Sequence, residues 1–169
     1  TSKTYTNTWA ILGSGTSNNP IRITVDAANT NHNGLVIFNY DFAGDLAHIT
    51  AIRCYGDYIS FEGNVGGECH LVISNLRNYL DRYAAVGIYG DATRGITIDH
   101  VAITNCNTPI RLQYSTEFQI RNCKLIQVRG DAAISLPQCT GSWDSSIVCG
   151  NLIEVLYNEA VPPGGGGAY

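Results

Sequence analysis

The sequence predicts an all-β solenoid of short parallel strands, of the parallel β-helix type. A six-residue pattern recurs in the chain. Its first and third residues are apolar, its fifth residue is Asn or His, and its sixth residue is again apolar. It begins at residues 71, 96, 118 and 147, so its spacings are 25, 22 and 29 residues. Repeats of this length are typical of stacked units that bury their apolar faces against one another. The apolar residues alternate with a period of two, which indicates strands and not helices.

The residue that follows each apolar pair supports the same fold. It is Asn75, His100, Asn122 or Asn151. Asn tolerates the left-handed backbone conformation, and its amide both donates and accepts hydrogen bonds. In stacked units these four side chains would lie about 4.8 Å apart and form a ladder inside a bend. A β-sandwich with a chance repeat remains the alternative, although it does not account for the fixed turn residue.

The remaining elements follow in chain order. Residues 1–20 are polar and predict an N-terminal arm, and residues 21–57 predict irregular first coils or a cap, because terminal units of a solenoid are atypical. Residues 58–160 predict the parallel β-helix, which brings the total to about five to six coils. Residues 161–169 are rich in Pro and Gly and predict a linker or tail. A second strand family is expected at 59–61, 86–88, 110–112 and 134–136.

Composition limits the classes of function. The formal net charge is −4 and 14% of residues are charged, which argues against a nucleic-acid groove. No apolar stretch is long enough for membrane insertion. The chain starts at Thr1 and contains no Met, so we expect a processed product or a fragment. The six cysteines include no C-x-x-C pair, so neither a metal site nor a cofactor is expected. Reduced structural thiols are expected, with a Cys139–Cys149 disulfide as the alternative.

The segments 95–106, 108–112 and 118–123 resemble coils of the right-handed parallel β-helix of pectate-lyase-like proteins. The resemblance covers about 100 residues of the chain. Within that superfamily the chain is most similar to the β-helical shafts of bacteriophage tailspikes. This resemblance implies a homotrimer that binds bacterial surface polysaccharide and in some cases cleaves it. Fold alone does not fix chemistry, so the site has to be argued from its residues.

Strand alternation predicts one exposed stripe that includes Tyr89 and Arg111 beside long inserted turns. The other members expected in the stripe are Ser60, Glu62, Gly87, Gln113 and Ser135. Sugar recognition needs aromatic faces and bidentate polar groups. The predicted binding residues are therefore Tyr89, Arg111, Trp143 and Arg82. Glycoside hydrolysis needs two carboxyl groups at a defined separation. The candidate pair is Asp91 and Asp144, although Asp beside Gly is also ordinary turn chemistry.

Three hypotheses about function follow. The first is a phage virion spike, or a spike segment, that binds host cell-surface polysaccharide. The second is an extracellular polysaccharide lyase or glycoside hydrolase that works as a monomer. The third is a capsid-decorating or filament-forming structural subunit.

Overall fold

The computed structural model describes residues 2–4, 8–26, 35–40, 49–76, 85–130, 132–140 and 146–155. Within these residues the protein is all-β, with three parallel sheets, one short antiparallel hairpin and no helix. Consequently this part of the chain contains no helix that is long and apolar enough to cross a membrane. The all-β prediction is confirmed, and the parallel sheets are compatible with the expected β-helix.

Each parallel sheet is assembled from strands that are distant in sequence. Sheet one contains, in spatial order, β1 (Ser2–Thr4), β4 (Val36–Asn39), β9 (Leu71–Ser74), β12 (Val101–Cys106), β15 (Lys124–Val128) and β18 (Leu152–Val155). Sheet two contains β2 (Trp9–Ile11), β5 (Ile49–Cys54), β10 (Ala85–Asp91), β13 (Thr108–Gln113) and β16 (Ile134–Ser135). Sheet three contains β3 (Ile21–Thr24), β6 (Ile59–Glu62), β11 (Thr97–Asp99), β14 (Gln119–Arg121) and β17 (Ile147–Cys149). The hairpin consists of β7 (Asn64–Val65) and β8 (Glu68–Cys69).

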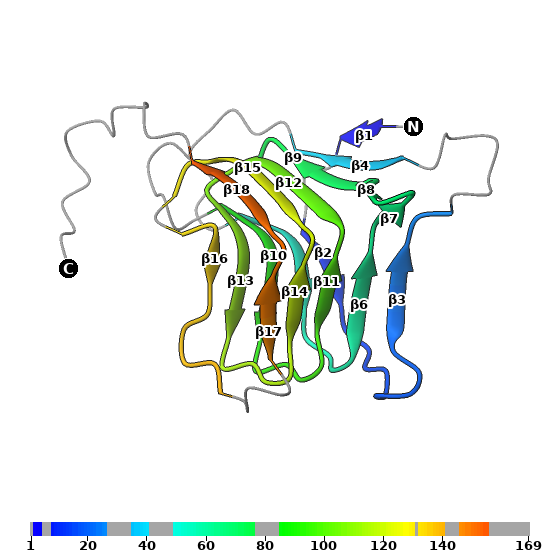
Figure 1. The fold of residues 1–169 in the computed structure, drawn as a ribbon. Helices are drawn as coiled ribbons and strands as arrows, with labels where there is room; N and C mark the ends of the chain where they lie inside the picture. Colours follow the sequence, from blue (N-terminus) through cyan, green and yellow to red (C-terminus); the bar gives the residue numbers. More distant parts are fainter. Residues whose placement is uncertain are drawn as a thin grey trace, which may run out of the picture.

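The chain visits the three sheets in a fixed cyclic order. From β9 onward, successive strands belong to sheets one, two and three and then to sheet one again. In Figure 1 the strands of sheet three face the viewer, those of sheet two lie behind them, and those of sheet one cross the top. The first two strands lie within residues 1–20, the expected polar arm, where Trp9–Ile11 pairs with β5. Residues 161–169, the expected tail, lie outside the described residues.

The core consists of columns of inward-facing side chains, one from each strand. In sheet two the column runs through Ile52, Ile88 and Ile110, which are register partners and fully buried. In sheet three, Phe61 and Ile98 occupy the equivalent column. Each strand adds one such side chain to the core. Burying a side chain of this size stabilises the fold by about 1.5–3 kcal/mol.

The expected single ladder of turn residues is wrong, because the pattern occurs at the ends of strands in two different sheets. Asn75 follows β9 in sheet one and belongs with Asn39 and Asn105. The Asn75 Nδ2 group donates to Asn39 Oδ1 at 2.6 Å, and Asn105 Nδ2 donates to Asn75 Oδ1 at 2.8 Å. His100 and Asn122 instead follow strands of sheet three. Asn75, Asn105, His100 and Asn122 all have φ between 52° and 61°, the left-handed region in which Asn is favoured.

The last repeat is displaced by one residue. Ile147 pairs with Gln119 and Cys149 with Arg121, so Gly150 (φ 62°) occupies the position equivalent to Asn122. Asn151 nevertheless serves its bend: its Oδ1 accepts from the Cys123 backbone N–H at 2.9 Å, and its Nδ2 donates to the Ile120 carbonyl at 3.1 Å. The pattern therefore identified a polar bend residue correctly but assigned its register incorrectly.

The second strand family also needs correction. Ile88, and not Val86, pairs with Ile110, which in turn pairs with Ile134. The strand at 59–61 belongs to sheet three and not to sheet two. The expected stripe is consequently divided between two faces: Tyr89, Arg111, Gln113 and Ser135 lie on sheet two, whereas Ser60 and Glu62 lie on sheet three.

Candidate functional site

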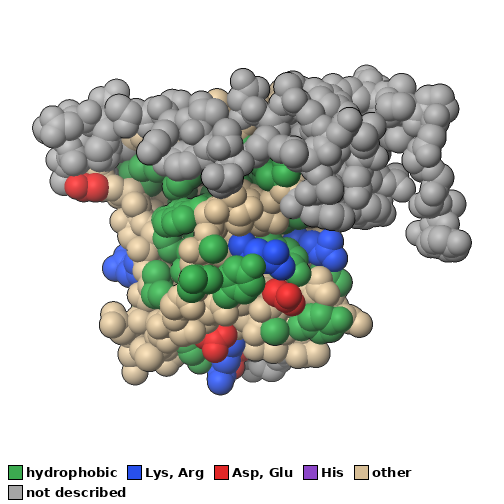
Figure 2. Space-filling model, turned by 180° about the vertical axis from the view of Figure 1, so that it is seen from behind, with side chains coloured by type: hydrophobic (Ala, Val, Ile, Leu, Met, Phe, Trp, Pro, Cys, Tyr) green, Lys and Arg blue, Asp and Glu red, His purple; other side chains and the backbone are tan. Residues whose placement is uncertain are grey.

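The outer face of sheet two aligns two arginines on either side of a tyrosine. Arg53 in β5, Tyr89 in β10 and Arg111 in β13 are register partners on three adjacent strands. We call these three residues the arginine–tyrosine row. Parallel pairing sets successive side chains about 4.8 Å apart, so the order Arg, Tyr, Arg follows directly from the register. Figure 2 views the molecule from the side of this sheet and shows basic side chains among hydrophobic ones.

Contacts within the row hold the tyrosine ring in place. The Arg53 guanidinium lies 4.8 Å from the centroid of the Tyr89 ring and 5.1 Å from that of the exposed Tyr55 ring. Such cation–π contacts orient a guanidinium without neutralising its charge. Gln113 links the other side: its Oε1 accepts from the Tyr89 hydroxyl and from Arg111 Nη2, both at 3.3 Å.

The two guanidinium groups retain unused binding capacity. Among the described residues, neither Arg53 nor Arg111 has a carboxylate within the 4.0 Å that defines an ion pair. Their Nε atoms are shielded from solvent and have no hydrogen-bond partner within the part of the chain that the structure describes. Arginine is always charged and presents a planar fork that matches carboxylates. The row therefore carries two positive charges that have no ion-pair partner among the described residues, on a protein of net charge −4.

The electrostatic surroundings keep Tyr89 neutral. Burial, followed by the negative charge of Asp91, raises the pKa of its phenol above the ordinary value. A protonated phenol both donates and accepts hydrogen bonds, which suits hydroxyl-bearing ligands. Asp91 ends β10, where it is the register partner of Gln113. The structure thus brings together Tyr89, Arg111 and Asp91 of the predicted site residues, while Arg82, Trp143 and Asp144 lie outside the described residues.

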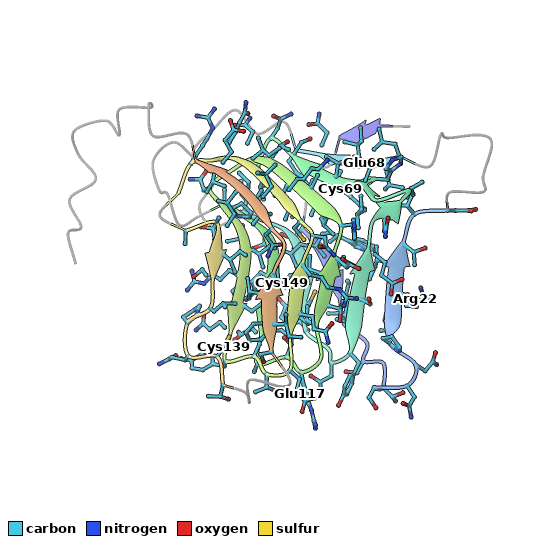
Figure 3. All side chains as sticks on the ribbon, viewed as in Figure 1. Arg22, Glu68, Cys69, Glu117, Cys139 and Cys149 are labelled. Carbon is cyan, nitrogen blue, oxygen red and sulfur yellow. The ribbon has the colours of Figure 1, made fainter. Side chains whose placement is uncertain are left out.

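Sheet three carries a second polar surface, a hollow of about 590 Å³. Its charged residues are Arg22, Glu62, Asp99 and Arg121, from four adjacent strands. Figure 3 labels Arg22 at one side of this sheet and Cys149 toward the other. The sequence suggested Glu62 but missed Arg22, Asp99 and Arg121. Strand alternation in 97–99 and 119–121 could have identified Asp99 and Arg121. Each is the third residue of its segment and so lies on the same outward face as the first residue.

The charges of this hollow are compensated internally. Arg22 Nε donates to both Glu62 carboxylate oxygens, at 3.0 and 3.1 Å, and Arg22 Nη2 donates to Glu62 Oε2. This arginine holds the pKa of Glu62 below its ordinary value. Asp99 Oδ1 lies 2.8 Å from His100 Nδ1 and accepts from Asn122 Nδ2 at 3.1 Å, and Asp99 Oδ2 lies 3.4 Å from Arg121 Nε. A general acid needs a raised pKa, so Glu62 is unsuited to that role.

The described cysteines and acidic residues show no metal-binding arrangement. No group of three or more His, Cys, Asp and Glu side chains converges within this part of the chain. All six cysteines are free thiols. The reduced state is the one expected, and the alternative Cys139–Cys149 disulfide is not formed.

The comparisons with known proteins yielded no relatives. No family model matches the chain, and no curated protein or solved structure matches it.

Proposed function

We propose that this chain is a right-handed parallel β-helix, similar to pectate-lyase-like proteins, that binds an acidic polysaccharide through the arginine–tyrosine row. The cyclic order of the three sheets supports the β-helix, since each circuit of the chain adds one strand to every sheet. In the proposed solenoid each of five coils, from β1 to β17, would contribute one strand to every sheet.

The observation that carries the ligand class is the pair of guanidinium groups of Arg53 and Arg111 on either side of Tyr89, which form no ion pair with the described residues. A polymer with a carboxylate on regularly spaced sugars satisfies both charges at once. The exposed Tyr55 ring, against which the Arg53 guanidinium lies, supplies an apolar surface for sugar stacking. Charge-assisted hydrogen bonds of this kind contribute about 1.5–3 kcal/mol each.

We further propose that the protein is a segment of a phage virion spike that binds the surface polysaccharide of the bacterial host as a homotrimer. This rests on the resemblance of the coils at 95–123 to tailspike shafts, together with the surface of sheet two. Binding is favoured over depolymerisation because Asp91 is the only carboxylate among the described strands of sheet two, so no second carboxylate lies beside it there. A hydrolase or lyase remains the second candidate, and a reducing-end or unsaturated-product assay distinguishes it.

The test is calorimetric titration with polygalacturonate, an acidic polymer, and with dextran, a neutral one. We expect binding of polygalacturonate only, weakened by salt because the contacts are ionic. Replacing both arginines by glutamine (Arg53→Gln with Arg111→Gln) should weaken binding at least tenfold, about 1.4 kcal/mol. Arg94→Gln is the control, because Arg94 is exposed and already paired with Glu117 at 2.7 Å. Equal binding by the double variant and the wild type would refute the proposal.

A further inference from the structure

The arginine–tyrosine row is the middle of a longer column that crosses the five described strands of sheet two. Ala10 in β2 is the register partner of Arg53, and Ser135 in β16 is the register partner of Arg111. In spatial order the column is Ala10, Arg53, Tyr89, Arg111 and Ser135. The register therefore places two cations on alternate strands, with an uncharged side chain between them and an uncharged side chain beyond each of them.

The two arginines lie two strand spacings apart. Neighbouring strands are about 4.8 Å apart, so the positions of Arg53 and Arg111 are separated by about twice that distance. Each guanidinium contacts the residue two positions further along its own chain segment: Arg53 lies 5.1 Å from the centroid of the Tyr55 ring, and Arg111 Nη2 donates to Gln113 Oε1 at 3.3 Å. Both groups are thus displaced in the same direction along the strands, which preserves their separation across the strands.

The position of Asp91 determines the direction in which an acidic chain lies on this face. Asp91 follows Tyr89 by two residues on β10, so strand alternation places both side chains on the outer face. An acidic polymer that ran along β10 would meet this carboxylate and be repelled by it. The column from Ala10 to Ser135 contains no acidic side chain. An acidic chain is therefore best accommodated across the strands, parallel to the stack.

We infer that the row selects acidic polysaccharides by the spacing of their charges, and that its ligand presents carboxylates on every second sugar. This inference rests on the proposed function, because it takes the row as the binding site. A pyranose ring with its glycosidic oxygen is about as long as one strand spacing, so three sugars span the distance from Arg53 to Arg111. The middle sugar lies over the neutral Tyr89, where a carboxylate has no cation directly beneath it. A neutral middle sugar is therefore accepted as well as an acidic one.

The experiment compares two trisaccharides of equal length and equal charge. Trigalacturonate with a methyl ester on its middle ring keeps its carboxylates on the two end rings, whereas the isomer esterified on its non-reducing end ring keeps them on neighbouring rings. Each is titrated in competition with bound polygalacturonate. We expect the middle ester to bind roughly tenfold more tightly, because it alone reaches both guanidinium groups. Arg53→Gln and Arg111→Gln should each bind the two isomers equally. Arg94→Gln should keep the wild-type preference, since Arg94 is paired with Glu117.

The outcomes separate this inference from the proposed function. If polygalacturonate binds but the two isomers compete equally, or neither competes, selection by spacing is overturned while the proposed function stands. A preference for the end-ring ester, or a preference that survives either single arginine substitution, overturns the inference in the same way. If polygalacturonate itself does not bind, the proposed function fails and the inference fails with it. Circular dichroism confirms that each variant is folded before its affinity is interpreted.

Discussion

The amide ladder of sheet one makes a quantitative prediction for Asn75. Its side chain accepts from Asn105 Nδ2 at 2.8 Å and donates to Asn39 Oδ1 at 2.6 Å, and its φ is 61°. The substitution Asn75→Leu removes both hydrogen bonds and places a branched side chain in the left-handed region. Losing the partner of Asn105 costs about 1–2 kcal/mol, the lower part of the usual range because the site is half-buried. The backbone conformation costs about a further 1 kcal/mol.

Asn75→Gly separates these two contributions. Glycine adopts a positive φ without steric cost, so this variant loses the amide bonds alone. We therefore expect Asn75→Leu to lower the free energy of unfolding by about 2–3 kcal/mol and Asn75→Gly by about 1–2 kcal/mol. Gln119→Leu, on the outer face of sheet three, should stay within about 0.5 kcal/mol of the wild type.

The assay is urea denaturation followed by far-ultraviolet circular dichroism, with the slope of the transition compared among variants. An unchanged slope permits the midpoints to be read as stability. If Asn75→Leu and Gln119→Leu unfolded at the same midpoint, the amide ladder would contribute nothing, and the reasoning would fail. If Asn75→Gly were as unstable as Asn75→Leu, only the assignment of backbone strain would be lost.

Three other predictions follow from individual residues. Burial raises the pKa of the Cys106 thiol from 9.0 to about 12, so the unfolded chain ionises first as pH rises. Stability should therefore fall above pH 9 by about 1.4 kcal/mol per unit from this thiol, and Cys106→Ala should flatten that slope in denaturation series at pH 8–11. Gly95→Ala should destabilise more than Gly66→Ala in thermal melts: both have positive φ, but only at Gly95 does a Cβ meet Tyr58, at 2.4 Å. The lowered pKa of Glu62 stabilises the fold above the pKa that this carboxyl has in the unfolded chain, and this contribution is lost as pH falls through the folded value. Glu62→Gln should reduce the acid-induced loss of stability, and an unchanged acid transition would contradict the importance of the Arg22–Glu62 pair.

The sequence was sufficient to predict strands, their parallel stacking and a polar residue at the bends. It was insufficient to predict which strands pair with one another. Strands of sheet one and strands of sheet three both end at a polar residue with a positive φ, so the local sequence does not distinguish them. Asn75 and His100 therefore carry the same local signal although they lie in different sheets. Register depends on which strands become neighbours, and pairs such as Leu71 and Val101 are separated by a whole circuit of the chain.

The candidate site was predicted only in part for a related reason. Tyr89 and Arg111 were identified because alternation places both outward, but Arg53 lay in the region 21–57 that the sequence predicted to be irregular. In the structure β5 is a regular strand that pairs with β10 over five residue pairs. The contact between Arg53 and Tyr89 depends on that long-range pairing, which no local pattern reports.

The same stacking principle explains why the two outer faces differ in how their charges are paired. On sheet three, Glu62, Asp99 and Arg121 are successive register partners, and Arg22 reaches Glu62 from the neighbouring strand. Each of the two carboxylates therefore pairs with an arginine: Glu62 with Arg22 and Asp99 with Arg121. On sheet two the register separates the two arginines by the neutral Tyr89. Coulomb repulsion between them falls with distance, while a ligand that bridges both gains two attractive contacts. The same parallel register thus gives one face whose opposite charges pair with each other and another face on which two arginines form no ion pair with the described residues.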